Sequence, residues 1–163
     1  MSTFDVIICN LALDKTFFED FTINSKIKNL SLIACDLVID QELLDVFSWH
    51  ALKILHIDHC DFPTVNLKID YGTTLEVLSV TNCELDKITL QFFNTHQENP
   101  LKFLNLSNNV LTNFSFYKNI IYIDCSTNRM TEIDLNLTTQ YDNYYHQPNL
   151  STYEKYINLS TCF

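Results

Sequence analysis

One eleven-residue spacing recurs along this 163-residue chain and limits the folds available to it. Each copy has apolar residues at places 1, 4, 6 and 11 and an asparagine or cysteine at place 9, as in "LKFLNLSNNVL". The copies cover residues 27–37, 52–62, 75–85, 101–111 and 120–130, so they begin 25, 23, 26 and 19 residues apart. A lone strand or helix would not produce this spacing. The sequence therefore predicts a repeat protein in which each copy adds one coil.

The spacing also predicts where each place points. Places 4 and 6 lie two residues apart, which indicates a short strand with these side chains inward and places 3, 5 and 7 outward. Successive strands are expected to pair in parallel about 4.8 Å apart, and no coil can bury its apolar side without neighbours. At place 9, Asn109 and Asn128 are expected to bond the backbone groups that turn inward there. Cys35, Cys60 and Cys83 are weaker equivalents at the same place.

With this motif the chain resembles the leucine-rich repeat family over residues 27–130. The resemblance implies an α/β solenoid, a curved coil with a parallel β-sheet on its concave face and mixed short helices and extended returns on its convex face. The returns at 38–51 and 86–100 are long enough for about two helical turns each. The returns at 63–74 and 112–119 are expected to be extended.

The pattern indicates a single leucine-rich repeat domain over residues 1–163. Clear repeats at 27–130 follow a degenerate coil at 1–26. A polar, tyrosine-rich irregular insertion at 136–152 precedes a partial last coil at 153–163. The inward residues expected in the two flanking coils are Phe4, Ile7 and Cys9, and Ile157, Leu159 and Cys162.

Composition excludes several classes of function. The net charge is −10 and the ten Lys and Arg residues are scattered, which argues against a nucleic-acid partner. No apolar run approaches the roughly 20 residues of a membrane-spanning helix. The only glycine is Gly72, so no phosphate-binding glycine loop is present and no cofactor is expected.

The six cysteines have two interpretations. Cys35, Cys60, Cys83 and Cys162 occupy place 9, whereas Cys9 and Cys125 are assigned to the inward place 6. These positions and the lack of any C-x-x-C pair favour buried structural thiols over a metal site. Neighbouring coils nevertheless lie within the Cα separation of a disulfide, so Cys60 could bridge to Cys35 or Cys83 in an oxidising compartment.

The stretch "HIDHCD" is the nearest approach to a catalytic cluster. His56 and Asp58 alternate on the outward side of one strand, with Ser31 and Ser79 expected on either side of His56. A zinc site needs three or four ligands, and no matching place in the neighbouring coils supplies another. No nucleophile and base are paired either, so the sequence predicts no catalytic residue and no metal ligand.

The outward places carry the predicted binding surface, because leucine-rich repeats usually bind partners on the concave face. Four apolar side chains at place 3 are expected to form a ridge beside polar and acidic columns at places 5 and 7, as protein interfaces favour. The alternative is that the ridge only stabilises the sheet by cross-strand pairing. We call Ile54, Val77, Phe103 and Tyr122 the apolar ridge. The predicted partner-binding residues are Ile54, His56, Asp58, Val77, Ser79, Phe103, Asn105, Tyr122 and Asp124.

The sequence therefore predicts a non-enzymatic module that binds a protein partner. An intracellular adaptor that presents a substrate to an enzyme complex, such as a ubiquitin ligase, is the alternative. The pattern "LNLSNNVLTNFSF" followed by "IDCSTNRMTEIDL" more narrowly resembles extracellular innate-immune leucine-rich repeat proteins of insects.

The sequence predicts an extracellular location if the chain is a fragment of a longer protein, and a cytoplasmic one otherwise. Glycosylation sequons favour secretion, whereas the N-terminal "MSTFDVIICN" has neither the basic start nor the apolar stretch of a signal peptide and favours the cytoplasm. The sequons include those at Asn105, Asn113, Asn136, Asn149 and Asn158.

Overall fold

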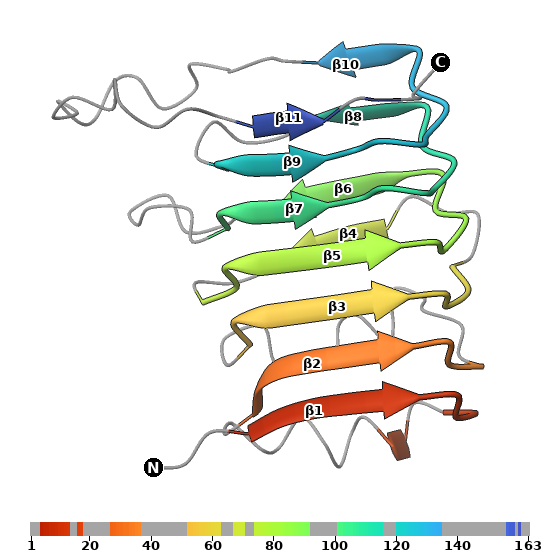
Figure 1. Ribbon diagram of the computed structural model, residues 1–163, viewed down its shortest axis with the longest axis vertical. Helices are drawn as coiled ribbons and strands as arrows, with labels where there is room; N and C mark the ends of the chain where they lie inside the picture. The colour runs from red at the N-terminus through yellow and green to blue at the C-terminus, as the bar shows by residue number, and fades with distance from the viewer. Residues whose placement is uncertain are drawn as a thin grey trace, which may run out of the picture.

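A seven-stranded parallel sheet dominates the computed structural model (Figure 1). Its strand order, β1-β2-β3-β5-β7-β9-β11, follows the chain, so the coils stack in sequence order. The strands are β1 (Phe4–Cys9), β2 (Ile27–Ile33), β3 (Ile54–Asp58), β5 (Val77–Thr81), β7 (Phe103–Asn105), β9 (Tyr122–Asp124) and β11 (Tyr156–Asn158). The structure describes residues 4–13, 16–17, 27–36, 52–62, 67–70, 74–91, 101–115, 120–134, 156–158 and 160. A parallel sheet built from repeat-like units is compatible with the predicted solenoid.

The strand register aligns equal places of the five clear copies. At place 3, Ile54 pairs with Val77, Val77 with Phe103, and Phe103 with Tyr122. At place 5, His56 lies between Ser31 and Ser79, as the sequence predicted. Each coil therefore repeats the same inward and outward assignment, and the predicted register is confirmed for these copies.

The first coil departs from the prediction by one residue. Val6 pairs with Leu30 at place 4 and Ile8 with Leu32 at place 6, whereas Ile7 is 68% exposed and Cys9 is exposed. The register shifts between Phe4 and Asp5, so this strand has one residue fewer before place 4 than the other coils. The assignment of Ile7 and Cys9 to the core is therefore wrong. Because side chains alternate with a period of two, a one-residue shift turns both outward.

Shorter strands lie behind the seven-stranded sheet (Figure 1). They form two parallel pairs: β4 (Leu67–Asp70) with β6 (Ile88–Gln91), and β8 (Asn113–Ser115) with β10 (Glu132–Asp134). The extended returns predicted at 63–74 and 112–119 are thus confirmed where they are described. The helix predicted over 86–100 is wrong at Ile88–Gln91, which is a strand; the one predicted over 38–51 lies outside the described residues. Among the described residues only Thr16 and Phe17 are helical.

The core between the two layers consists of the repeated apolar places. Leu55, Leu78 and Leu104 at place 4 of successive coils are all fully buried. Places 1 and 11 are buried as well, with Leu101 and Leu111 fully inaccessible. Burying one leucine side chain contributes roughly 1.5–3 kcal/mol. Each coil buries its apolar side chains against those of the coils on either side, so the stack is stable only as a whole.

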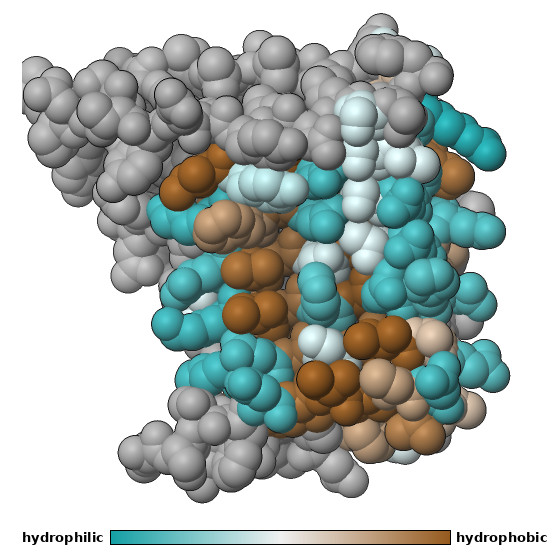
Figure 2. Space-filling view, in the orientation of Figure 1, coloured by the Kyte–Doolittle hydropathy of each residue, from teal (hydrophilic) through white to brown (hydrophobic). Residues whose placement is uncertain are grey.

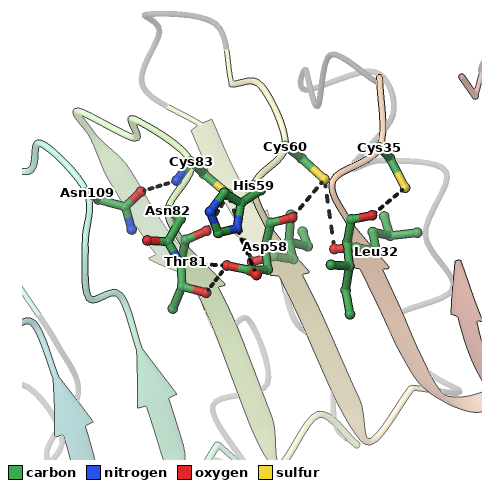
Figure 3. A network of polar contacts seen from close by, with 11 residues as sticks. Leu32, Cys35, Asp58, His59, Cys60, Thr81, Asn82, Cys83 and Asn109 are labelled. Atoms are coloured by element: carbon green, nitrogen blue, oxygen red, sulfur yellow. Dashed lines mark hydrogen bonds and ion pairs between the residues drawn. The ribbon is translucent and has the colours of Figure 1, made fainter. Parts of the chain in front are cut away.

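Where place 9 is an asparagine, its carboxamide hydrogen-bonds the backbone of its own turn and of the preceding coil. Asn109 Oδ1 accepts hydrogen bonds from the backbone N–H groups of Cys83 (3.1 Å, Figure 3) and Leu85 (3.2 Å). Its Nδ2 lies 2.7 Å from the carbonyl oxygen of Val80, 3.0 Å from that of Leu106 and 3.2 Å from that of Ser107. A buried amide with this many partners satisfies backbone groups on two coils, which is the predicted role of place 9.

A thiol at place 9 makes fewer and weaker hydrogen bonds than the carboxamide does. Cys60 Sγ lies 3.8 Å from the carbonyl oxygen of Leu32 in the preceding coil and 3.5 Å from that of Asp58 (Figure 3). Cys83 Sγ donates in the same way to Ile57 and Thr81, at 3.9 and 2.9 Å. Sulfur is a weak donor and a weak acceptor, so these turns depend more on burial than on hydrogen bonding.

Place 8 requires a left-handed backbone in every clear copy. Asn82 and Asn108, with φ of 53° and 56°, are residues that tolerate this region. Ala34 and Thr127, at 49° and 55°, adopt it without that advantage. In the first coil Asn10 has φ of 54°, which identifies it as place 8 and independently supports the shifted register. The turn that ends each strand is thus imposed by the stack and not by local residue preference.

Replacing Asn109 with alanine tests the importance of place 9. We expect Asn109→Ala to lower the free energy of unfolding by about 3 kcal/mol, because it leaves buried N–H and C=O groups of two coils without partners. Urea unfolding followed by circular dichroism measures the change. The matched control is Asn113→Ala at an exposed asparagine, for which we expect less than about 0.5 kcal/mol. Equal effects of the two substitutions would contradict this role.

Candidate functional site

The outward face of the seven-stranded sheet, defined by places 3, 5 and 7, holds all nine predicted partner-binding residues. Figure 2 views this face directly and shows brown and tan side chains along one side of the sheet, with teal and white side chains beside them. The apolar side corresponds to place 3, where the chain enters each strand. The face is therefore divided into an apolar band and a polar band that run across the strands.

The apolar ridge is partly open to solvent along its length. Phe103 is 47% exposed, whereas Ile54, Val77 and Tyr122 are half-buried. The rings of Phe103 and Tyr122 lie with centroids 6.1 Å apart and planes tilted by 38°, a favourable aromatic arrangement. The ridge thus combines cross-strand packing with accessible apolar surface.

Charged side chains at place 2 border the ridge. Lys53 Nζ lies 3.0 Å from Glu76 Oε1, and both side chains are more than half exposed. A surface ion pair of this kind contributes little to stability. Lys28 and Lys102 occupy the same place in their own coils. The border is therefore polar, solvated and available for contact with another molecule.

At place 5 several side chains are already held by their own coil. Asn105 Oδ1 accepts hydrogen bonds from the backbone N–H and the hydroxyl of Ser107, at 3.0 and 2.7 Å. Asp124 Oδ1 accepts from the backbone N–H of Ser126 at 2.9 Å. Ser79 differs, because its hydroxyl is buried and has no hydrogen-bond partner among the described residues. A buried hydroxyl without a partner lowers stability, because it has lost its hydrogen bonds to water and gained none in return.

Asp58 is the centre of a polar cluster at the carboxyl end of β3 (Figure 3). Its Oδ1 accepts from Thr81 Oγ1 at 2.7 Å and from Asn82 Nδ2 at 2.8 Å, and its Oδ2 lies 2.9 Å from His59 Nδ1. Burial raises the pKa of this carboxyl, but the three hydrogen bonds and the charge of protonated His59 together leave the pKa below its ordinary value of 3.8. The cluster holds two coils together at their turns.

Asp58 bonds one residue that the sequence indicated and two that it did not. The stretch "HIDHCD" singled out His56, Asp58 and His59; the carboxylate bonds His59 of that stretch, and Thr81 and Asn82 of the next coil. His59 and Asn82 both occupy place 8, where the left-handed backbone directs the chain back toward place 7. The position of place 8 in the repeat would have indicated these contacts if it had been recognised as a turn. Among the described residues no three His, Cys, Asp or Glu side chains are grouped to hold a metal ion.

The described cysteines are free thiols, and four of the five are buried. Burial raises the pKa of Cys60, and burial together with the neighbouring Cys60 and Asp58 raises the pKa of Cys83 to about 12. A thiol with a raised pKa is a poor nucleophile and a poor metal ligand at neutral pH. Cys35, Cys60, Cys83 and Cys125 are buried as expected; Cys162 lies outside the described residues.

Searches against family models, curated proteins and solved structures found no match to this chain. No helix in the described parts of the chain is long and apolar enough to cross a membrane.

The lowered pKa of Asp58 predicts a pH-dependent contribution to stability. A group with a lower pKa in the folded chain stabilises it fully above the ordinary value of 3.8, and this stabilisation is lost as pH falls through the lowered pKa. We therefore expect Asp58→Asn to destabilise the chain at pH 6 and to approach the wild type as pH falls below about 4. Urea unfolding at a series of pH values measures the difference. Asp61→Asn, at an exposed carboxylate of the same turn, is the control; a gap that is constant with pH would contradict the prediction.

Proposed function

We propose that this chain is a leucine-rich repeat module without enzymatic activity that binds a protein partner through the outward face of its seven-stranded sheet. The observation that carries the proposal is the apolar ridge, in which four side chains lie in register and remain partly exposed. Protein interfaces are enriched in such aromatic and aliphatic anchors surrounded by polar groups. The charged border at place 2 and the polar column at place 5 supply that surround.

Cross-strand pairing alone is a weaker explanation of the ridge. Such pairs stabilise a sheet by roughly 0.2–1 kcal/mol each, and side chains that serve only this purpose need no accessible surface. Phe103 leaves nearly half of its surface accessible, and the exposed ion pair of Lys53 and Glu76 lies just before β3 and β5 of the same sheet. An accessible apolar anchor with a polar border favours an interface.

Removing both aromatic rings tests the proposed interface. We expect Phe103→Ala with Tyr122→Ala to weaken partner binding at least about 30-fold, because buried aromatic anchors contribute about 2 kcal/mol or more each. The free energy of unfolding should fall by about 0.5–1.5 kcal/mol for the aromatic pair, plus a contribution for the apolar area that the two rings bury, and the chain should stay folded. The wild type, the double variant and the control Lys87→Ala with Asn113→Ala are immobilised, and captured proteins are compared by quantitative mass spectrometry.

A protein retained by the wild type and the control but lost by the aromatic double variant supports the proposal. Its affinity for each variant is then measured by calorimetry. Equal affinity for the wild type and the double variant would contradict the assignment of the ridge as the interface.

A further inference from the structure

Strand β1 is an outer strand of the seven-stranded sheet and is built unlike a protected edge. It spans Phe4–Cys9 and pairs with β2 on one side; among the residues that the structure describes, none pairs with its other side. Edge strands are normally kept from pairing by shortness, proline, lysine or bulges that turn them away. The opposite edge strand, β11, has only three residues. In contrast, β1 has six residues, "FDVIIC", with neither proline nor lysine, and its one register irregularity lies between Phe4 and Asp5, so Asp5–Cys9 is a regular strand.

Exposed apolar side chains are concentrated in the same coil. Of the four large hydrophobic residues that are exposed among those described, three belong to it: Ile7 at 68%, Leu11 at 50% and Phe17 at 37%. Cys9 is exposed, and Ile33 on β2 is half-buried beside it. Figure 2 shows the resulting brown area over β1 and β2, apart from the apolar ridge. Open backbone groups and exposed apolar side chains together mark a pairing surface.

The backbone orientation of β1 follows from its contacts with β2. The N–H of Asn10 donates to the carbonyl oxygen of Ile33, and the carbonyl of Ile8 faces Cys35 in the next coil. In a strand, alternate residues direct their N–H and C=O groups to the same side, so the even-numbered residues face β2. Asp5, Ile7 and Cys9 therefore direct their N–H and C=O groups to the open side of the sheet.

We propose that β1 pairs antiparallel with β1 of a second copy of this chain across a twofold axis, with Ile7 opposite its own counterpart. This register forms three hydrogen-bonded pairs, each exchanging two bonds: Ile7 with Ile7, and Asp5 with Cys9 in both directions. Shifting the register by two residues in either direction leaves only two such pairs. The axis is perpendicular to the sheet, so Val6 and Ile8, the inward residues of the two copies, face each other and continue the core.

Charge is compatible with this register. Asp5 is the only charged residue of β1, and its carboxylate already accepts a hydrogen bond from Asn29 at 2.7 Å. Opposite Cys9, the two Asp5 side chains are separated by about 13 Å along the strands, beyond the Debye length of about 8 Å at physiological salt. Each chain nevertheless carries a formal charge of −10, so salt should favour the pair by screening the repulsion. This inference concerns a different surface from the proposed partner site and does not depend on it.

Sedimentation velocity of the full chain between about 1 and 200 μM tests the pairing. We expect the wild type to form a dimer whose dissociation constant falls as NaCl rises from 50 to 500 mM, and no larger species. Ile7→Lys places two like charges directly opposite and should raise the dissociation constant at least about 100-fold. Because Ile7 is 68% exposed, the folded monomer should be retained, which circular dichroism checks.

Two further variants keep the test decisive. Ile7→Pro removes the central N–H donor from the open side only, so it should abolish the dimer while β1 stays paired with β2. Phe103→Lys, on the same face but far from β1, should leave the dimer intact while disrupting the proposed partner site. A wild type that is monomeric at 200 μM, a dimer unaffected by Ile7→Lys, or open-ended assembly would each overturn the proposal.

Discussion

Shared burial between coils is the constraint on which the rest of this structure depends. Leu55, Leu78 and Leu104 are fully buried only because each is covered by the equivalent residue of the next coil. A single coil places its apolar side chains on one side of a strand of only a few residues, which cannot exclude water. Parallel pairing and equal register follow, because a one-residue slip would turn a coil's leucines to solvent. The repeat spacing in the sequence follows from this requirement for shared burial.

Polar groups inside the stack occur where the backbone requires them. The chain leaves each strand through a left-handed residue at place 8, and the backbone groups exposed by that turn are bonded at place 9. Asn109 and Asn128 bond several groups each, whereas Cys60 and Cys83 reach carbonyl oxygens only weakly. Burial of the thiols must offset that difference in the earlier coils. The two residue types at one place therefore reflect two ways to stabilise the same turn.

The sequence was sufficient for the register of five coils because four apolar places and place 9 agree in every copy. The first coil was misassigned because "FDVIIC" is apolar at both alternating positions, and the shift at Phe4 and Asp5 has no sequence signal. The helix expected over 86–100 was wrong at Ile88–Gln91 because a short apolar stretch fits either period, and pairing with β4 decided it. Asn82 was missed as a partner of Asp58 because the contact depends on where the left-handed turn directs its side chain.

The same turn geometry divides the outward face into two regions of different character. Near the carboxyl ends of the strands, Asp58, Asn105 and Asp124 already bond groups of their own or the next coil. A partner that contacts these groups must compete with those hydrogen bonds, so the net binding free energy gained there is small. At the amino ends, the apolar ridge offers accessible surface whose burial is favourable without such competition. Of the nine predicted binding residues, those of the ridge should therefore dominate affinity, and the polar ones should determine orientation.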